Sequence, residues 1–308
     1  QSLFLINDEI ADIVKNTFSG FSDLHTLGLD FNNLTHVKKS WFTGLTNLHY
    51  LSLSKNKIEQ IDPGCFKNLP NLHLDLQHNL LQVIDPVWFS GRRYLSYLYL
   101  GYNKAKIEDI EENTFRDFSF LTTLGLDFNR LRHVKRSWFP FLQGLSFLTL
   151  SNNKIEQIDP GCFNNLPNLL HLDLERNLLQ IIEAAWFFGH SNIRSLYLGF
   201  LTLSNNKIEQ IDPGCFKNLP NLLHLDLQRN LLQIIEAAWF FGHSNIRCLY
   251  LGYNNIRSIP FNAFQNLNIL DELSFLTLSN NKIEQIDPGC FKNLPNLLHL
   301  DLQHNLLQ

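Results

Sequence analysis

One pattern of leucines and asparagines returns along this chain at a spacing of about 24 residues. It reads L-x-L-x-x-[N/D]-x-[L/I/A], and a fixed period of this length is typical of a repeat array rather than of one compact core. The leucine pairs begin at Leu3, Leu27, Leu51, Leu74, Leu98, Leu124, Leu148, Leu172, Leu201, Leu225, Leu249, Leu276 and Leu300. We therefore expect a single solenoid of about 13 repeats over residues 1–308, although length alone favours two domains.

Each repeated residue has a predicted structural role. The L-x-L pair reads as a short strand whose leucines point inward and whose intervening residues point to the opposite face. The asparagine that follows, such as Asn56 or Asn153, can bond backbone groups that the turning chain leaves unpaired. A phenylalanine about ten residues later, such as Phe66 or Phe163, predicts a stacked hydrophobic spine beneath the outer surface.

Four repeat types, D, A, B and C, recur in that order, and the residue before the spine phenylalanine depends on the type. It is tryptophan in A and C repeats, cysteine in B repeats, and threonine or alanine in D repeats, so large and small side chains alternate. We interpret the tryptophans as packing. The B-repeat cysteines, Cys65, Cys162, Cys215 and Cys290, lie too far apart for disulfides and are predicted to be buried thiols, which leaves Cys248 as the candidate reactive thiol.

Composition and charge exclude several classes of function. A formal net charge of −4 without a basic run offers no electrostatic footprint for DNA or RNA. No apolar stretch approaches the ~20 residues of a membrane span. Gln1 opens in the middle of the pattern without a signal peptide, so we expect a mature fragment with no nucleic-acid partner and no membrane span.

The sequence holds no standard catalytic or nucleotide-binding motif, so we predict no enzyme, no catalytic residue and no cofactor. The pairs in His-Leu-Asp-Leu, at His73/Asp75 and three later positions, put both side chains on one face, roughly 6.5 Å apart along the strand. A metal needs converging ligands at about 2 Å. We therefore predict local hydrogen bonds for these aspartates and no metal site.

The stretch from Ile58 to Leu72, I-E-Q-I-D-P-G-C-F-K-N-L-P-N-L, carries the most diagnostic likeness to known proteins. It resembles the outer segment of the animal extracellular "typical" leucine-rich repeats of Toll-like receptor ectodomains, insect immune repeat proteins, variable lymphocyte receptors and matrix proteoglycans. The resemblance covers essentially the whole chain. It implies an α/β-type repeat solenoid, right-handed and curved, with a parallel sheet on the concave face and a mostly irregular convex side.

The resemblance also implies binding by the concave face without naming the ligand. Members of the family usually cap both ends with cysteine-rich modules, whereas this array starts and stops inside repeats, so we expect no capping modules within it. Aromatic and acidic side chains at the outward strand positions have the composition of a recognition surface. The predicted ligand-binding residues are Tyr50, Tyr97, Tyr99, Tyr102, Asp127, Phe147, Tyr250, Tyr253 and Phe275.

The leading hypothesis is an extracellular binding module, secreted or part of a receptor ectodomain in innate immunity, that recognises a protein or glycan ligand. The alternative is a structural, self-assembling extracellular protein with end-to-end or other homo-oligomeric contacts, which the near copies at residues 148–199 and 201–252 favour. On either hypothesis the aromatics could also simply shield the strand backbone. Asn33-Leu34-Thr35 is an acceptor sequence for N-glycosylation, with Asn33 as the modified residue.

One junction breaks the period. At Leu196-Tyr197-Leu198-Gly199-Phe200-Leu201-Thr202-Leu203 two strand signatures collide, and the spacing around them is about one repeat short. We predict that part of a D repeat is missing, with an interruption between Gly199 and Phe200. We also expect Leu203 and Asn206 in normal register, and Tyr197 and Leu198 still in a strand of the preceding repeat. A smaller irregularity, the loss of one residue, falls near Leu72 and His73.

Overall fold

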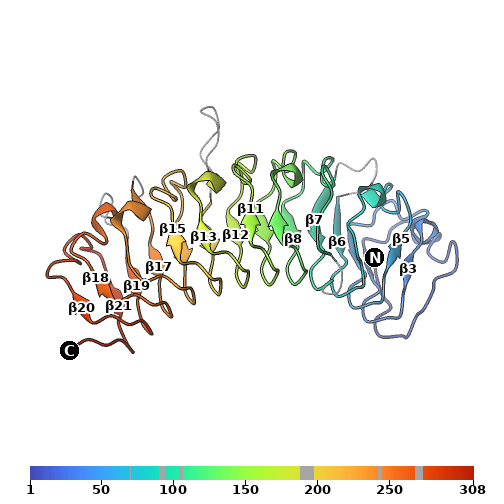
Figure 1. The fold of residues 1–308 in the computed structure, drawn as a ribbon. Helices are drawn as coiled ribbons and strands as arrows, with labels where there is room; N and C mark the ends of the chain where they lie inside the picture. Colours follow the sequence, from blue (N-terminus) through green and yellow to red (C-terminus); the bar gives the residue numbers. More distant parts are fainter. Residues whose placement is uncertain (70, 90–93, 104–106, 188–197, 242–244, 268–272) are drawn as a thin grey trace. The chain divides into compact units, whose positions relative to one another are not determined.

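The computed structural model describes residues 1–69, 71–89, 94–103, 107–187, 198–241, 245–267 and 273–308. Two compact units make up the chain, unit 1 over Gln1–Asn153 and unit 2 over Lys154–Gln308. In each unit the chain winds in successive coils, with one strand of a parallel sheet per coil (Figure 1). This is the leucine-rich-repeat solenoid that the sequence predicts.

The sheet of unit 1 follows chain order, with parallel pairing between successive members. Its strands are β1 (Ser2–Phe4), β2 (Thr26–Gly28), β4 (Tyr50–Ser52), β6 (Leu72–Asp75), β7 (Leu95–Tyr99), β8 (Thr123–Gly125) and β10 (Phe147–Thr149). The other elements of the unit are short: β3 (His36–Val37), β5 (Gln60–Ile61), β9 (His133–Val134) and the 3-10 turns η1 (Lys39–Phe42), η2 (Pro86–Phe89) and η3 (Arg136–Trp138).

Unit 2 repeats this plan, again with parallel pairing in chain order. Its sheet strands are β12 (His171–Asp173), β14 (Phe200–Thr202), β16 (His224–Asp226), β17 (Cys248–Tyr250), β19 (Phe275–Thr277) and β21 (His299–Asp301). The remaining elements are β11 (Gln157–Ile158), β13 (Ile181–Ile182), β15 (Gln210–Ile211), β18 (Ser258–Ile259), β20 (Gln285–Ile286), η4 (Ala184–Phe187), η5 (Ala237–Phe240) and η6 (Gln265–Leu267). The helical turns of the described residues span three or four residues, so the prediction of an irregular outer side is confirmed.

The asparagine ladder is confirmed by its hydrogen bonds. The amide of Asn56 donates to the carbonyl oxygen of Leu53 in its own coil, at 3.0 Å, and to that of Leu29 in the preceding coil, at 2.9 Å. Its Oδ1 accepts from the backbone N–H of Leu34 at 3.1 Å. Because one buried side chain satisfies backbone groups of two coils, it fixes both the turn and the stacking.

The residue before each ladder asparagine adopts a left-handed backbone conformation, with φ of 58° at Tyr102 and 54° at Phe128. This region costs an L-residue roughly 1–2 kcal/mol. The buried ladder holds these residues in this conformation despite the cost. The conformation turns their side chains out beside the sheet. Every coil thereby presents one additional side chain next to its strand.

The predicted spine is confirmed at Phe66 and Phe163, which are fully buried, while Phe291, near the C-terminal end of unit 2, is half-buried. Rings of neighbouring coils stack, as at Phe66 and Phe89 with centroids 5.7 Å apart. All five tryptophans are buried as packing residues, and so are the four B-repeat cysteines as free thiols. Burial raises the pKa of the Cys65 thiol, which keeps it protonated.

At the irregular junction, β14 is the next strand of the sheet after β12. Strand β14 pairs directly with β12, with Phe200 opposite His171, and Asn206 bonds the carbonyl of Leu174 at 3.0 Å, so the predicted register of Leu203 and Asn206 is confirmed. Leu198 is fully buried but lies outside any strand, so the strand predicted there is wrong at Leu198, while Leu196 and Tyr197 lie outside the described residues.

Leu198 precedes Leu201 by three residues, as the buried Leu222 precedes Leu225 in the next coil. A leucine of the shortened D repeat therefore serves as the packing residue of the B repeat that follows it. The N–H groups of Gly199 and Phe200 both donate to the carbonyl of Leu170, at 2.9 and 3.0 Å, the arrangement that Leu223 and His224 make with Gly199. The two residues thus enter β14 in the normal register. The predicted loss of part of a D repeat from the sequence stays a prediction.

The one-residue loss near Leu72 is absorbed within the sheet. Leu72 opposes Leu95 and His73 opposes Tyr97, so the pairing of β6 with β7 skips one residue of β7. Register beyond the bulge is normal, with Leu74 opposite Leu98.

Candidate functional site

Four columns of side chains cover the sheet of each unit because successive strands pair in register. In the coil of β4 the first column holds Tyr50, before the leucine pair; the second holds Ser52, between the leucines; the third holds Ser54; and the fourth holds the left-handed Lys55. Equivalent residues of neighbouring coils lie about 4.8 Å apart, which is close enough for rings to stack.

The first column of unit 1 is a stack of rings around one histidine. The ring centroid of His73 lies 4.6 Å from that of Tyr50 and 4.9 Å from that of Tyr97, and Tyr99 of the second column lies 5.3 Å away. Burial lowers the pKa of His73, so its imidazole is neutral at pH 7. Burial, together with nearby Asp75, raises the pKa of the Tyr50 phenol.

The fourth column of unit 1 forms a second stack. His78, Tyr102 and Phe128 follow one another with centroid separations of 3.9 Å, and the planes of Tyr102 and Phe128 differ by 11°. Further toward the N-terminus, the Lys55 ammonium lies 4.2 Å from the centroid of Phe31, a cation–π contact in the same column.

Glycines in the second and third columns make room for larger neighbours. A Cβ placed on Gly125 would lie 2.9 Å from Cδ1 of Tyr99, and one on Gly101 would lie 2.9 Å from Oδ2 of Asp127. The Tyr99 ring and the Asp127 carboxylate therefore lie low over the glycines of the adjacent strands. Oδ1 of Asp127 accepts a hydrogen bond from the Thr149 hydroxyl at 2.9 Å.

The structure thus gathers five predicted residues into one patch over β4, β6, β7 and β8 of unit 1: Tyr50, Tyr97, Tyr99, Tyr102 and Asp127. Tyr97 is 40% exposed there, and the other four are half-buried. Phe147, 46% exposed, stands in the first column two strands from Tyr97, on β10. Asn33 is half-exposed in the turn after the ladder residue Asn32.

The remaining predicted residues lie in unit 2. Tyr250 of β17 contacts Phe275 of β19 at 5.6 Å, and Phe275 stacks on His299 at 4.2 Å. Tyr253 is 43% exposed but carries the Arg229 guanidinium 4.1 Å above its ring. One ring face of Tyr253 is therefore already occupied by a cation of the same chain.

Sequence reasoning missed the histidines and Phe128 as members of these stacks. The His-Leu-Asp-Leu pattern raised His73 as a potential metal ligand, but its ring lies between those of Tyr50 and Tyr97, and the ring of His78 lies against that of Tyr102. Among the described residues no cluster of histidine, cysteine, aspartate and glutamate could hold a metal ion. Asp75 does accept a local hydrogen bond from the N–H of Gln77, at 2.9 Å, as predicted. Aligning the coils column by column would have exposed the alternation of histidine with tyrosine.

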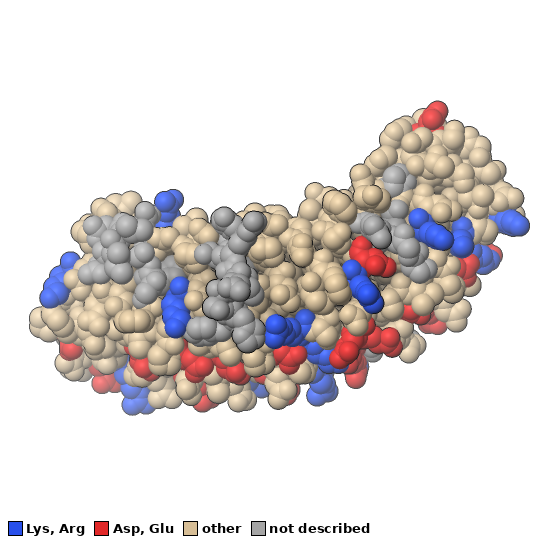
Figure 2. Space-filling model, turned by 90° about the horizontal axis from the view of Figure 1, so that it is seen from above, with Lys and Arg blue, Asp and Glu red and all other residues tan. Residues whose placement is uncertain are grey.

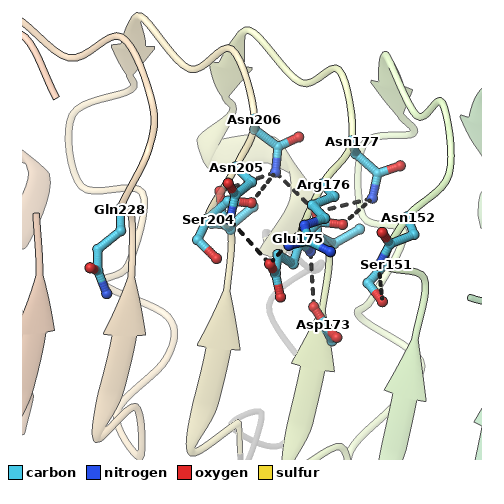
Figure 3. A network of polar contacts seen from close by, with 12 residues as sticks. Ser151, Asn152, Asp173, Glu175, Arg176, Asn177, Ser204, Asn205, Asn206 and Gln228 are labelled. Atoms are coloured by element: carbon cyan, nitrogen blue, oxygen red, sulfur yellow. Dashed lines mark hydrogen bonds and ion pairs between the residues drawn. The ribbon is translucent and has the colours of Figure 1, made fainter. Parts of the chain in front are cut away.

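Polar contacts occupy part of the sheet face of unit 2. Glu175 lies 3.4 Å from the Arg176 guanidinium and accepts a hydrogen bond from the Asn205 amide at 3.1 Å (Figure 3).

On the face of the molecule drawn in Figure 2, basic side chains are interspersed with acidic ones rather than gathered into one basic region. None of the helices in the described parts of the chain has the length and apolar character to cross a bilayer.

Comparison with known proteins agrees with this architecture. The chain is 29% identical to lumican of Coturnix japonica over 252 residues, which is 72% of this chain and 61% of lumican. It is 31% identical to Toll-like receptor 3 of Bos taurus over 266 residues, which is 75% of this chain and 26% of the receptor. The chain thus spans less than two thirds of either relative.

Among solved structures, the Drosophila Toll–Spatzle complex contains a chain that superposes with a TM-score of 0.85 at 27% identity, over 96% of this chain and 38% of that one. The APL1 leucine-rich repeat domain, at 20% identity and a TM-score of 0.70, covers 99% of this chain and 74% of that chain and shares its fold. The leucine rich repeat family model matches residues 22–81, 73–131, 119–169, 143–200, 201–256 and 272–308. The coil geometry, the asparagine ladder and these matches agree, and the chain belongs to the leucine-rich repeat family.

Proposed function

We propose that this chain is an extracellular, non-enzymatic binding module that holds a protein ligand on the sheet face of unit 1, over β4, β6, β7 and β8. The observation that carries the proposal is the patch of Tyr50, Tyr97, Tyr99, Tyr102 and Asp127, which combines exposed or half-exposed rings with a carboxylate. Tyrosines supply large contact area at low entropic cost, and such residues dominate the energetics of protein interfaces.

The relatives support a protein ligand over a glycan. Toll is in complex with Spatzle in the solved structure that this chain resembles, and another similar structure is the LRIM1/APL1C complex. Lumican and Toll-like receptor 3 support an extracellular setting. A glycan ligand, the other option that the sequence left open, becomes an outcome of the test.

The test places the photo-crosslinking residue p-benzoylphenylalanine at Tyr97 and, in a separate protein, at Val83 of the outer face, which is 57% exposed. Each protein is irradiated in extracellular fluid of the source organism, and cross-linked protein is identified. The affinity of the captured protein is then measured for wild type, for a Tyr97→Ser/Tyr102→Ser variant and for a matched Tyr250→Ser/Tyr253→Ser variant of unit 2. We expect the first variant to bind at least tenfold more weakly, roughly the loss of one hot spot, and the matched variant to bind like wild type.

Capture only from Val83, or equal affinity of all three proteins, would contradict a site on the sheet face of unit 1. If binding disappears when the glycans of the captured partner are removed, the ligand is a glycan. Unchanged circular dichroism of each variant shows that the loss is not one of folding.

An observation on the outer side favours the structural alternative. Exposed aliphatic side chains recur at one position of the C repeats: Val83 at 57%, Ile181 at 40% and Ile234 at 52% exposure. Within unit 2, Ile181 and Ile234 could pack against a second copy of the chain. Sedimentation velocity over a hundredfold range of concentration tests it: a concentration-dependent oligomer that Ile234→Lys abolishes would favour self-assembly, and a monomer throughout would remove it.

Asn33 is proposed as a glycosylated residue of the same extracellular protein. Its side chain is half-exposed and follows the buried Asn32, so an oligosaccharide at Asn33 would leave the ladder intact. Secreted protein should lose mass on treatment with an N-glycosidase, and Asn33→Gln should migrate like the treated wild type. A glycosidase that leaves the mass unchanged would contradict the assignment.

A further inference from the structure

The Tyr99 ring and the Asp127 carboxylate lie side by side in the unit 1 patch. A single point, the position of a Cβ on Gly125, is 2.9 Å from Cδ1 of Tyr99 and 3.5 Å from Oδ1 of Asp127. Glycine at both 101 and 125 lets these two groups lie low, while Tyr97 of the first column and Tyr102 of the fourth flank them. A ring face and an anion next to each other are the two features that a guanidinium group recognises.

The acceptor capacity of Asp127 is incompletely used. Its Oδ1 accepts from Thr149, whereas Oδ2 accepts no hydrogen bond from the described residues. An ionised carboxylate has about four acceptor positions. Half-exposed on the sheet face, Asp127 can therefore receive further N–H donors from outside the chain.

Two other aromatic rings on the sheet faces already make cation–π contacts. Lys55 lies over Phe31, and Arg229 lies over Tyr253, both in the fourth column. The four columns over β6, β7, β8 and β10 contain Asp75 and Asp127 but no lysine or arginine. This stretch is net negative, and its own columns supply no cation for the rings, so charge complementarity favours a partner that brings one.

Resting on the proposed function, we infer that the Tyr99–Asp127 pair is the anchor point for a partner's arginine side chain presented on a protein loop. The guanidinium plane lies against the Tyr99 ring, and its N–H groups donate to Asp127. Arginine fits better than lysine because its flat, weakly hydrated guanidinium can stack and donate two parallel hydrogen bonds at once.

The test uses the whole chain labelled with 3-fluorotyrosine, whose eight tyrosines each give one fluorine resonance. N-acetyl-arginine amide is titrated in, and N-acetyl-citrulline amide serves as the neutral control of the same shape. We expect the arginine probe to shift the Tyr99 and Tyr102 resonances saturably, the Tyr253 resonance to stay in place because Arg229 covers that ring, and citrulline amide to shift none of them. In Asp127→Asn, which can still accept from Thr149, the apparent affinity for the arginine probe should fall about tenfold.

Equal shifts with arginine and citrulline, no shift with either, or an unchanged titration of Asp127→Asn would overturn the inference. Its failure is separable from that of the proposed function. If the partner still cross-links to position 97 and still needs Tyr97 and Tyr102, the binding face stands and only the arginine anchor falls.

Discussion

Strands β4, β6 and β7 of unit 1 and strands β14, β16 and β17 of unit 2 belong to the same B, C and D repeat types, yet their outward faces differ. The buried leucines and ladder asparagines are alike in both sets. Outward, the first column changes from Tyr50, His73 and Tyr97 to Phe200, His224 and Cys248, and the fourth changes from Lys55, His78 and Tyr102 to Asn205, Arg229 and Tyr253.

The next strand widens the difference. In unit 1, β8 brings Gly125, and Asp127 follows it, whereas in unit 2 β19 brings Thr277 to the equivalent second-column position and Ser279 to the third. Unit 2 therefore lacks both the glycine that accommodates a flat tyrosine ring and the carboxylate beside it. The inward positions pack against neighbouring coils and vary little, while the outward positions are free to change.

The largest expected effect tests whether the buried cores of the two units are equally stable. Phe66→Ala in unit 1 and Phe163→Ala in unit 2 each remove a fully buried ring from the spine, and each should lower the free energy of unfolding by ~3–5 kcal/mol through the cavity left behind. Phe147→Ala, on the sheet face, serves as the matched control and should cost far less. Urea unfolding followed by circular dichroism measures all three, and a spine variant as stable as the control would contradict equal cores.

A second expected effect concerns the ladder. Asn56→Ala leaves the buried N–H of Leu34 without its acceptor, and it removes one of the two amide donors to each of the carbonyls of Leu29 and Leu53, which should cost ~2–3 kcal/mol. Asn205→Ala changes a half-buried fourth-column residue that bonds Glu175, and it should cost under ~1 kcal/mol. The same urea series compares them. Equal losses would mean that the ladder contributes no more than a surface hydrogen bond.

Most of the fold could be predicted from the sequence because the period determines it. Each of the thirteen leucine pairs coincides with a strand of the described structure, and the spine and ladder follow. The junction was misjudged because Leu198 fits two repeat positions, as a strand leucine of a D repeat or as the packing leucine before a B strand. The pairing of β14 with β12 selects the second.

The proposed binding patch was harder to predict because it depends on neighbours in adjacent coils. Tyr99 and Asp127 were recognisable as outward residues, but that they lie side by side results from glycine at both 101 and 125. Likewise, the stacking of His73 with Tyr50 and Tyr97 needs the register across β4, β6 and β7, including the bulge at Leu72. The residue types in each column could be read from the sequence. The contacts between side chains of different columns could not.

A third prediction uses a difference between the buried tryptophans of the two units. The indole N–H of Trp41 donates to the carbonyl of Ile13 at 2.9 Å, whereas that of Trp239 is buried with no partner among the described residues. Trp41→Phe therefore loses a hydrogen bond and leaves a carbonyl unpaired, while Trp239→Phe removes an unsatisfied donor. We expect Trp41→Phe to cost ~1 kcal/mol more than Trp239→Phe in urea unfolding. Equal costs would show that the two sites are energetically the same.

The smallest expected effect is a dependence of stability on pH that comes from His73, in the first-column stack of unit 1, and from His224, which stacks on Phe200 in unit 2. Burial lowers the pKa of His73, and burial together with Arg247 lowers that of His224. A depressed folded-state pKa means that the unfolded chain binds a proton first, so stability falls as the pH drops below the ordinary histidine value near 6.5. The fall is complete once the pH lies below the folded-state pKa.

Measuring the free energy of unfolding at pH 7 and pH 5.5 for wild type, His73→Gln and His224→Gln isolates this contribution. Each variant should lose less stability between the two pH values than wild type does, because glutamine does not titrate. Asp75 and Asp226 have their pKa raised by burial, but a carboxyl with a raised pKa makes the fold more stable as the pH falls, so it opposes the histidine effect and cannot imitate it. Variants that track wild type across this interval would show that the stacked imidazoles are as easily protonated in the fold as in the unfolded chain.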